Sequence, residues 1–123
     1  MKVAVFGNRS INDPKIVYPF IDELAKIKAD HLVFLHGGAR GPQKIITEWA
    51  FEQGITNIIL FKPWHMIDDS LEFTTELYFL RNVQIVDNAD LVVLITNGER
   101  DSEVDRVRAY ALRKNVETLI IEV

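Results

Sequence analysis

The residues with the clearest chemistry are the six from His36 to Gly41, which read His-Gly-Gly-Ala-Arg-Gly. They follow an apolar run, 32–35, and precede a stretch of helical pattern, 42–53. Glycines let a backbone approach a ligand closely, and a helix N-terminus offers unpaired N–H groups with a positive dipole end. Arg40 adds a forked donor that suits phosphate. The pattern indicates a phosphate site, with a plain strand-to-helix turn as the alternative. The residues of this predicted site are Gly37, Gly38, Ala39, Arg40 and Gly41.

A second polar turn follows the first apolar run of the chain, 3–6. Its residues Gly7, Asn8 and Arg9 can form a backbone cradle with a guanidinium beside it. A simple turn with a solvated arginine is the alternative. This turn is therefore a second candidate for contact with an anionic ligand.

Two aromatic residues also follow apolar runs. His36 can contact a ligand or act as an acid or base, and the alternative is a hydrogen bond to a neighbouring loop. Trp64 can stack on a base or cover a pocket, and packing in a core or lid is the alternative. Both are candidates for a site at the same end of the predicted strands.

Arg81 and Asn82 interrupt an otherwise apolar helical pattern. A side chain at Arg81 can reach the glycine-rich loops from across a cleft. The alternative is an ion pair, for which the sequence supplies three nearby carboxylates. These are Glu76, Asp87 and Asp90.

A mixed run of charges lies between residues 99 and 108. Such a run is typical of a solvated helix face. One of its carboxylates can instead serve in catalysis, and Glu103 and Glu99 are the candidates.

Several classes of site lack the residues that they need. The chain has no cysteine, so no disulfide or thiolate chemistry is available. His31, His36 and His65 lack paired spacing, so we expect no metal site. We also expect no cofactor. No Gly-x-Ser-x-Gly elbow is present.

Short apolar runs and helical patterns alternate along the chain. The runs are 3–6, 32–35, 58–61, 91–95 and 118–121, and the helical patterns cover roughly 14–27, 42–53, 70–87 and 102–114. Continuous apolar runs are typical of strands buried on both faces of a parallel sheet. The alternation predicts an α/β fold, a Rossmann-like doubly wound parallel sheet of about five strands flanked by helices. Ligands of such folds bind at the carboxyl edge of the sheet, where the strand order reverses.

Length and charge restrict the partners. The 123 residues predict a single domain, 1–123. The net charge is −4, so no basic field favours nucleic acid, and we do not expect it as a partner. No apolar run approaches the length of a membrane span, and the N-terminus is too short for a signal-peptide core. We expect a cytoplasmic protein that does not enter membranes.

The motifs together resemble a known family. Residues 5–9, 36–41, 48–50, Trp64 and 81–82 occur in the order found in the SLOG superfamily of Rossmann-like domains, most closely its YspA-like bacterial and phage branch of unknown function. Relatives include the LOG phosphoribohydrolases and the DNA-processing protein DprA. The resemblance implies a nucleotide or nucleotide-derived ligand with phosphate at Gly37–Gly41. It implies further contacts at Gly7, Arg9, Arg81 and Asn82.

The loop after the fourth apolar run departs from these relatives. They typically carry Pro-Gly-Gly-x-Gly-Thr there, whereas Thr96–Asp101 reads Thr-Asn-Gly-Glu-Arg-Asp and keeps only Gly98. The two acids of this loop argue against an unmodified phosphate cradle. In the LOG enzymes a glutamate three residues after the motif assists glycosidic cleavage, and an ungapped count places Val104 there, beside Glu103.

Three functions follow in order of preference. The first is binding of a nucleotide-derived small molecule, as a sensor or sequestering domain. The second is hydrolysis of the N-glycosidic bond of nucleoside 5′-monophosphates, with Glu103 or Glu99 acting on the ribose. The third, single-stranded DNA binding by analogy with DprA, is disfavoured by the acidic composition. The resemblance also implies a homodimer, to which Phe73, Leu77, Tyr78 and Phe79 can contribute, or these residues can belong to the core.

Overall fold

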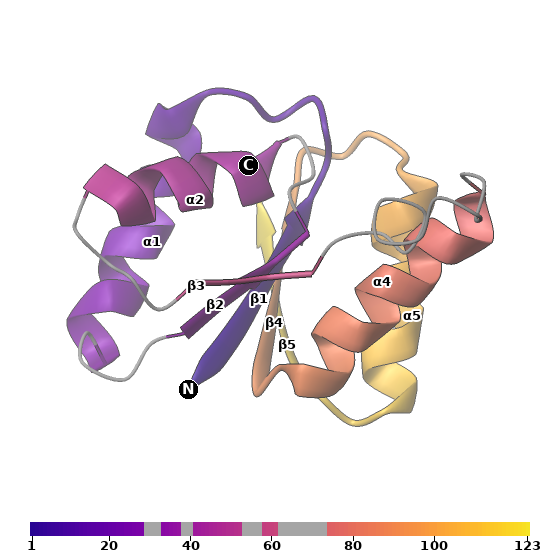
Figure 1. Ribbon diagram of the computed structural model, residues 1–123. Coiled ribbons are helices and arrows are strands. Elements are labelled where there is room, and N and C mark those ends of the chain that lie inside the picture. The colour runs from indigo at the N-terminus through magenta and orange to yellow at the C-terminus, as the bar shows by residue number, and fades with distance from the viewer. Residues whose placement is uncertain (29–32, 38–40, 53–57, 62–73) are drawn as a thin grey trace.

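Strands and helices alternate along the chain in a computed structural model, which describes residues 1–28, 33–37, 41–52, 58–61 and 74–123 (Figure 1). The strands are β1 (Lys2–Gly7), β2 (Val33–His36), β3 (Ile58–Leu60), β4 (Leu91–Thr96) and β5 (Glu117–Glu122). The helices of the described part are α1 (Pro14–Lys28), α2 (Pro42–Glu52), α4 (Thr75–Asn88) and α5 (Ser102–Arg113). Each strand lies within two residues of the apolar run that predicts it.

The strands form one parallel sheet in the order β3-β2-β1-β4-β5. Val3 of β1 pairs with Phe34 of β2 on one side and with Leu91 of β4 on the other. The chain builds outward from β1 to β3, and then builds in the other direction through β4 and β5. The strand order therefore reverses between β1 and β4, which confirms the predicted α/β arrangement and its switch point.

Alternate residues of each strand face opposite layers of helices. Val3 and Val5 belong to an apolar cluster that includes residues of α1 and α2, whereas Ala4 and Phe6 belong to a cluster that includes residues of α4 and α5. Figure 1 shows the same division, with α1 and α2 on one face of the sheet and α4 and α5 on the other. Because strand side chains alternate with a period of two, a continuous apolar run supplies both cores.

Polar side chains at the helix ends set where the helices begin. The Asp13 carboxylate accepts a hydrogen bond from the Lys15 N–H (3.0 Å), and α1 begins at Pro14, as the sequence predicts. The hydroxyl of Thr74 accepts from the Leu77 N–H (3.1 Å) at the start of α4. Within the described residues, no helix has the length and apolar character that crossing a membrane requires.

Candidate functional site

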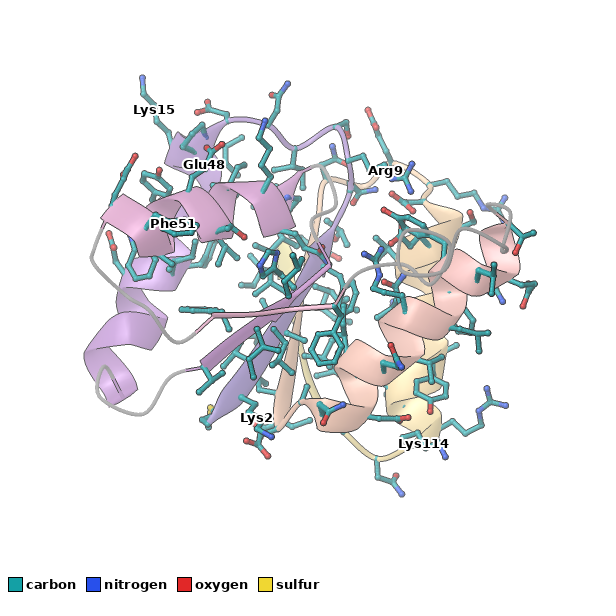
Figure 2. The ribbon with its side chains drawn as sticks, viewed as in Figure 1. Lys2, Arg9, Lys15, Glu48, Phe51 and Lys114 are labelled. Carbon is teal, nitrogen blue, oxygen red and sulfur yellow. The ribbon has the colours of Figure 1, made fainter. Side chains whose placement is uncertain are left out.

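The loops after β1 and β4 lie side by side at the carboxyl edge of the sheet, because their strands are neighbours. Arg9 of the first loop projects at this edge, and Lys2 lies at the opposite end of the same strand (Figure 2). Helix α5 begins at Ser102, just after the second loop. The fold thus gathers the predicted residues of the loop after β1 and of the stretch from β4 into α5 at one edge.

Hydrogen bonds join these two loops to each other. The buried Asn8 side chain donates to the Glu99 carbonyl (3.0 Å) and accepts from the Asn97 N–H (3.2 Å). Ser10 accepts from the Asn97 amide (2.8 Å) and donates to the Glu99 carboxylate (2.8 Å). The side chains of Asn8 and Ser10 and the amide groups of Asn97 are therefore already bonded within the protein.

The glycines at this edge bring chain segments together. A Cβ at Gly7 would lie 2.4 Å from the Pro42 side chain, so the start of α2 rests directly on β1. Gly41 has φ +87°, and a Cβ there would lie 2.7 Å from the Asn8 carbonyl oxygen. Gly98 has φ +83° with open space around it, so it serves the turn alone. In the described backbone, Gly7 and Gly41 provide close packing between loops.

Arg81 is fully buried and reaches the loop after β2. Its Nη1 donates to the Gly37 carbonyl, and its Nε donates to the Asn82 side chain (2.8 Å). The guanidinium lies 4.2 Å from the centre of the Tyr78 ring. Among the described residues, the carboxylate that pairs with Arg81 is Glu103, at 4.0 Å from Nη2, and not any of the three that the sequence suggested.

Glu103 joins the buried arginine to the exposed one. Its carboxylate accepts from the Asn82 amide (2.9 Å) through Oε1 and from the Arg9 guanidinium (2.9 Å) through Oε2. The Glu103 side chain is 20% exposed. The hydrogen bond to Glu103 raises the pKa of Arg9, which stays cationic. Asp101 fixes this arrangement, because its carboxylate accepts from the Glu103 and Val104 N–H groups (3.0 and 3.3 Å) and caps α5.

A cleft of about 400 Å³ opens between α4, α5 and the loop after β1. Its lining combines guanidinium groups, aromatic rings, a carboxylate, an amide and a hydroxyl. The lining residues are Arg9, Tyr78, Phe79, Asn82, Ser102, Glu103 and Arg106. Its volume falls within the range of small-molecule sites.

Four of the lining residues are absent from the predicted site. Tyr78 and Phe79 were predicted only for a dimer surface or the core, and Ser102 and Arg106 were not singled out for a site. One signal was available, because Glu103 and Arg106 stand three residues apart and therefore on one face of a helix. Glu99 does not line the cleft, and its carboxylate is bonded to Ser10.

His36 lies at the end of β2, partly buried. Its Nδ1 is 3.4 Å from the Thr47 hydroxyl of α2. Burial, and to a smaller extent the charge of Arg81, lowers the pKa of His36 below its ordinary 6.5. The lowered pKa favours the neutral ring at pH 7. The contact of His36 is with helix α2, and not with the neighbouring loop of the alternative interpretation.

Some predicted site residues lie outside the described part of the chain. They are Gly38, Ala39, Arg40 and Trp64. Gly37 is described, and its N–H donates to the side-chain oxygen of Gln43 (3.2 Å). Over the residues that are described, no three histidine, aspartate or glutamate side chains gather as a metal would require.

The comparison with protein families decides the relationship. The model of the YspA, cpYpsA-related SLOG family matches residues 1–66. The chain belongs to this family. A search of curated proteins finds no match.

A solved structure shares the fold of this SLOG protein. It is DNA processing protein A from Helicobacter pylori, described for its single-stranded DNA binding mode, with a TM-score of 0.74 and 16% sequence identity. The match covers 98% of this chain and 64% of the solved one, so the SLOG protein spans less than two thirds of that length.

This match corrects the expectation that nucleic acid is not a partner. That expectation rested on the net charge of −4, and it is wrong because the same fold occurs in a protein that binds single-stranded DNA. Net charge averages over the whole surface, whereas binding depends on local charge. Arg9 and Arg106 both line one cleft of this acidic chain.

Proposed function

We propose that this protein binds a nucleotide or nucleotide-derived small molecule in the cleft between α4 and α5, as a sensing or sequestering domain. The observation that carries the proposal is the lining of the cleft. Arginines suit phosphate, the Glu103 carboxylate suits ribose hydroxyls, and the rings of Tyr78 and Phe79 offer flat apolar surface to a base. The family and the position beside the switch point support the same ligand class.

The test is thermal stability against nucleoside monophosphates, NAD, ADP-ribose and cyclic nucleotides. A ligand that binds the folded state alone adds about 2.7 kcal/mol of stability at a hundredfold excess over its Kd. We expect a selective rise in Tm for the wild-type protein that disappears in Ser102→Trp, whose side chain fills the cleft. Ala109→Trp, on an exposed position of α5 outside the cleft lining, is the matched control. A rise that survives Ser102→Trp would place the ligand elsewhere.

Single-stranded DNA is a second candidate ligand, supported by the fold match over 98% of the chain. Aromatic rings and arginines are also what unstacked bases and their backbone require. Fluorescence anisotropy with labelled oligo-dT tests this candidate. Binding of the oligonucleotide that Ser102→Trp abolishes would support it, and no binding at low salt would reject it.

Hydrolysis of an N-glycosidic bond is a candidate activity, supported by the position of Glu103 in the cleft. A carboxylate held by Arg9 and Asn82 can stabilise the positive charge that develops on the ribose as the base departs, or can activate the attacking water. We expect Glu103→Gln to abolish release of free base from nucleoside monophosphates and to retain their binding. Unchanged release would reject this role.

A further inference from the structure

Arg106 is the cleft arginine whose carboxylate partner is the more exposed, since the Glu76 side chain is 75% exposed and that of Glu103 is 20% exposed. Its guanidinium carbon lies over the Phe79 ring, 3.9 Å from the ring centre, in a cation–π contact that restricts where the group can move. Both of its hydrogen bonds, at 3.2 and 3.5 Å, run from Nη2 to the Glu76 carboxylate. Within the described residues, Nε and Nη1 make no further bond, so three N–H donors stay available on a residue that lines the cleft.

The other two arginines are less suited to an anionic ligand. Arg81 is fully buried, is not among the cleft-lining residues and donates to the Gly37 carbonyl. Arg9 is exposed, but Glu103 is bonded to it and is held in place by Asn82. A phosphate at Arg9 would meet the negative charge of Glu103 at close range. That carboxylate makes the part of the cleft beside Arg9 unfavourable for an anion.

The carboxylate that pairs with Arg106 is easily displaced. The Glu76 side chain is 75% exposed and that of Arg106 is 38% exposed. Ion pairs of this kind contribute little to stability, because water screens them and long side chains lose freedom in forming them. Glu76 therefore neutralises Arg106 in the free protein without blocking it.

We propose that Arg106 receives the phosphate of the bound ligand, with its guanidinium placed over the Phe79 ring and Glu76 as the displaceable counter-ion. This inference rests on the proposed function, and it places the phosphate on α5 rather than at the switch-point loops. The ligand then lies with its anionic end at Arg106 and its uncharged end toward Glu103. Glu76 acts as a competitor for the same guanidinium.

Calorimetric titration with matched probes, AMP against adenosine and GMP against guanosine, tests the assignment. We expect Arg106→Gln to weaken the affinity for the monophosphates at least about tenfold, since a charged hydrogen-bond pair is lost. The affinity for the nucleosides should stay unchanged. Glu76→Gln should raise the affinity for the monophosphates up to about fivefold, because the carboxylate that competes for Arg106 is gone. Arg106→Lys should recover part of the affinity for the monophosphates. Arg108→Gln, an exposed arginine of α5 outside the cleft lining, is the control.

The outcomes separate this assignment from the proposed function. If Arg106→Gln lowers the affinity for nucleotide and nucleoside equally, Arg106 has a structural role and the assignment is overturned. Wild-type affinity for the monophosphates in Arg106→Gln would place the phosphate elsewhere, with the proposed function intact. If neither monophosphates nor nucleosides bind the wild-type protein, the proposed function fails, and the assignment fails with it.

Discussion

Gly37 packs directly against the buried guanidinium of Arg81. A Cβ at this position would lie 2.0 Å from Nη1 of Arg81 and 2.4 Å from its Cζ. The guanidinium cannot retreat without losing its bonds to the Gly37 carbonyl and to Asn82. We expect Gly37→Ala to lower the unfolding free energy by about 1–3 kcal/mol, the usual cost of overpacking. Urea denaturation measures this loss.

The same Gly37→Ala substitution in an Arg81→Met protein identifies the cause of that loss in stability. Arg81→Met removes the guanidinium that the new methyl group would touch. Neighbouring substitutions that share a contact are not additive. Gly37→Ala should therefore cost less in the Arg81→Met protein than in the wild type. Equal costs in the two backgrounds would contradict the steric explanation.

His36 gives the stability a dependence on pH. Its pKa in the folded protein lies below the ordinary 6.5, first because of burial and second because of the charge of Arg81. As the pH falls below 6.5, the unfolded chain takes up a proton at His36 before the folded chain does. The unfolding free energy therefore falls with decreasing pH across this window and gains nothing from His36 above it.

Urea denaturation at about pH 7.5, 6.5 and 5.5 measures this effect, since most carboxylates stay ionised over that range. We expect His36→Asn to show a shallower decline than the wild type. The difference between the two proteins isolates His36 from the other histidines. Parallel curves for both proteins would contradict the lowered pKa.

At the scale of elements, the N-terminus of α5 connects stability to the site. Asp101 caps the helix through the N–H groups of Glu103 and Val104, and Glu103 then holds Arg9 and Asn82. We expect Asp101→Ala to cost about 1 kcal/mol of unfolding free energy, the usual effect of losing an N-cap. Asp101→Asn should retain most of this stability, because its side-chain oxygen can accept the same bonds. Thermal denaturation of both variants is the measurement, and an equal loss in both would assign the effect to charge instead.

The elements themselves follow from local patterns that the sequence displays directly. Val3 to Phe6 and Leu91 to Ile95 are apolar without interruption, and each forms a strand buried on both faces. Asp13 followed by Pro14 predicts the start of α1, and the structure confirms it. The alternation of strands and helices then determines which loops share an edge.

The cleft does not follow from such local patterns. The cation–π contact between Arg106 and Phe79 depends on how α4 packs against α5, and sequence spacing within either helix does not determine that geometry. The hydrogen bonds of Asn8 to Asn97 and to Glu99 join residues that are 89 and 91 positions apart in the sequence. They depend on the pairing of β1 with β4. Residues were therefore predicted well where neighbours in sequence decide their role, and poorly where two distant elements decide it.

At the scale of the whole molecule, the net charge is negative, but the cleft contains two positively charged side chains. The chain carries 18 acidic and 14 basic residues. Two of the arginines line the cleft, where Glu103 and Glu76 bind them in the free protein. A protein with a negative net charge can thus hold a local site for anions. A polyanion such as single-stranded DNA should then bind through few contacts between phosphates and cationic side chains.

This distribution predicts a shallow salt dependence if single-stranded DNA binds in the cleft. Each phosphate that a cationic side chain neutralises on a single strand contributes a slope of about −0.7 in log K against log salt concentration. Because Glu103 occupies Arg9, Arg106 alone predicts a slope of about −0.7 for oligo-dT, and Arg106→Gln should bring the slope close to zero. Anisotropy titrations over a series of salt concentrations measure both slopes. A much steeper wild-type slope would mean that DNA follows a longer basic path than the cleft, and an unchanged slope in Arg106→Gln would exclude this arginine from the contact.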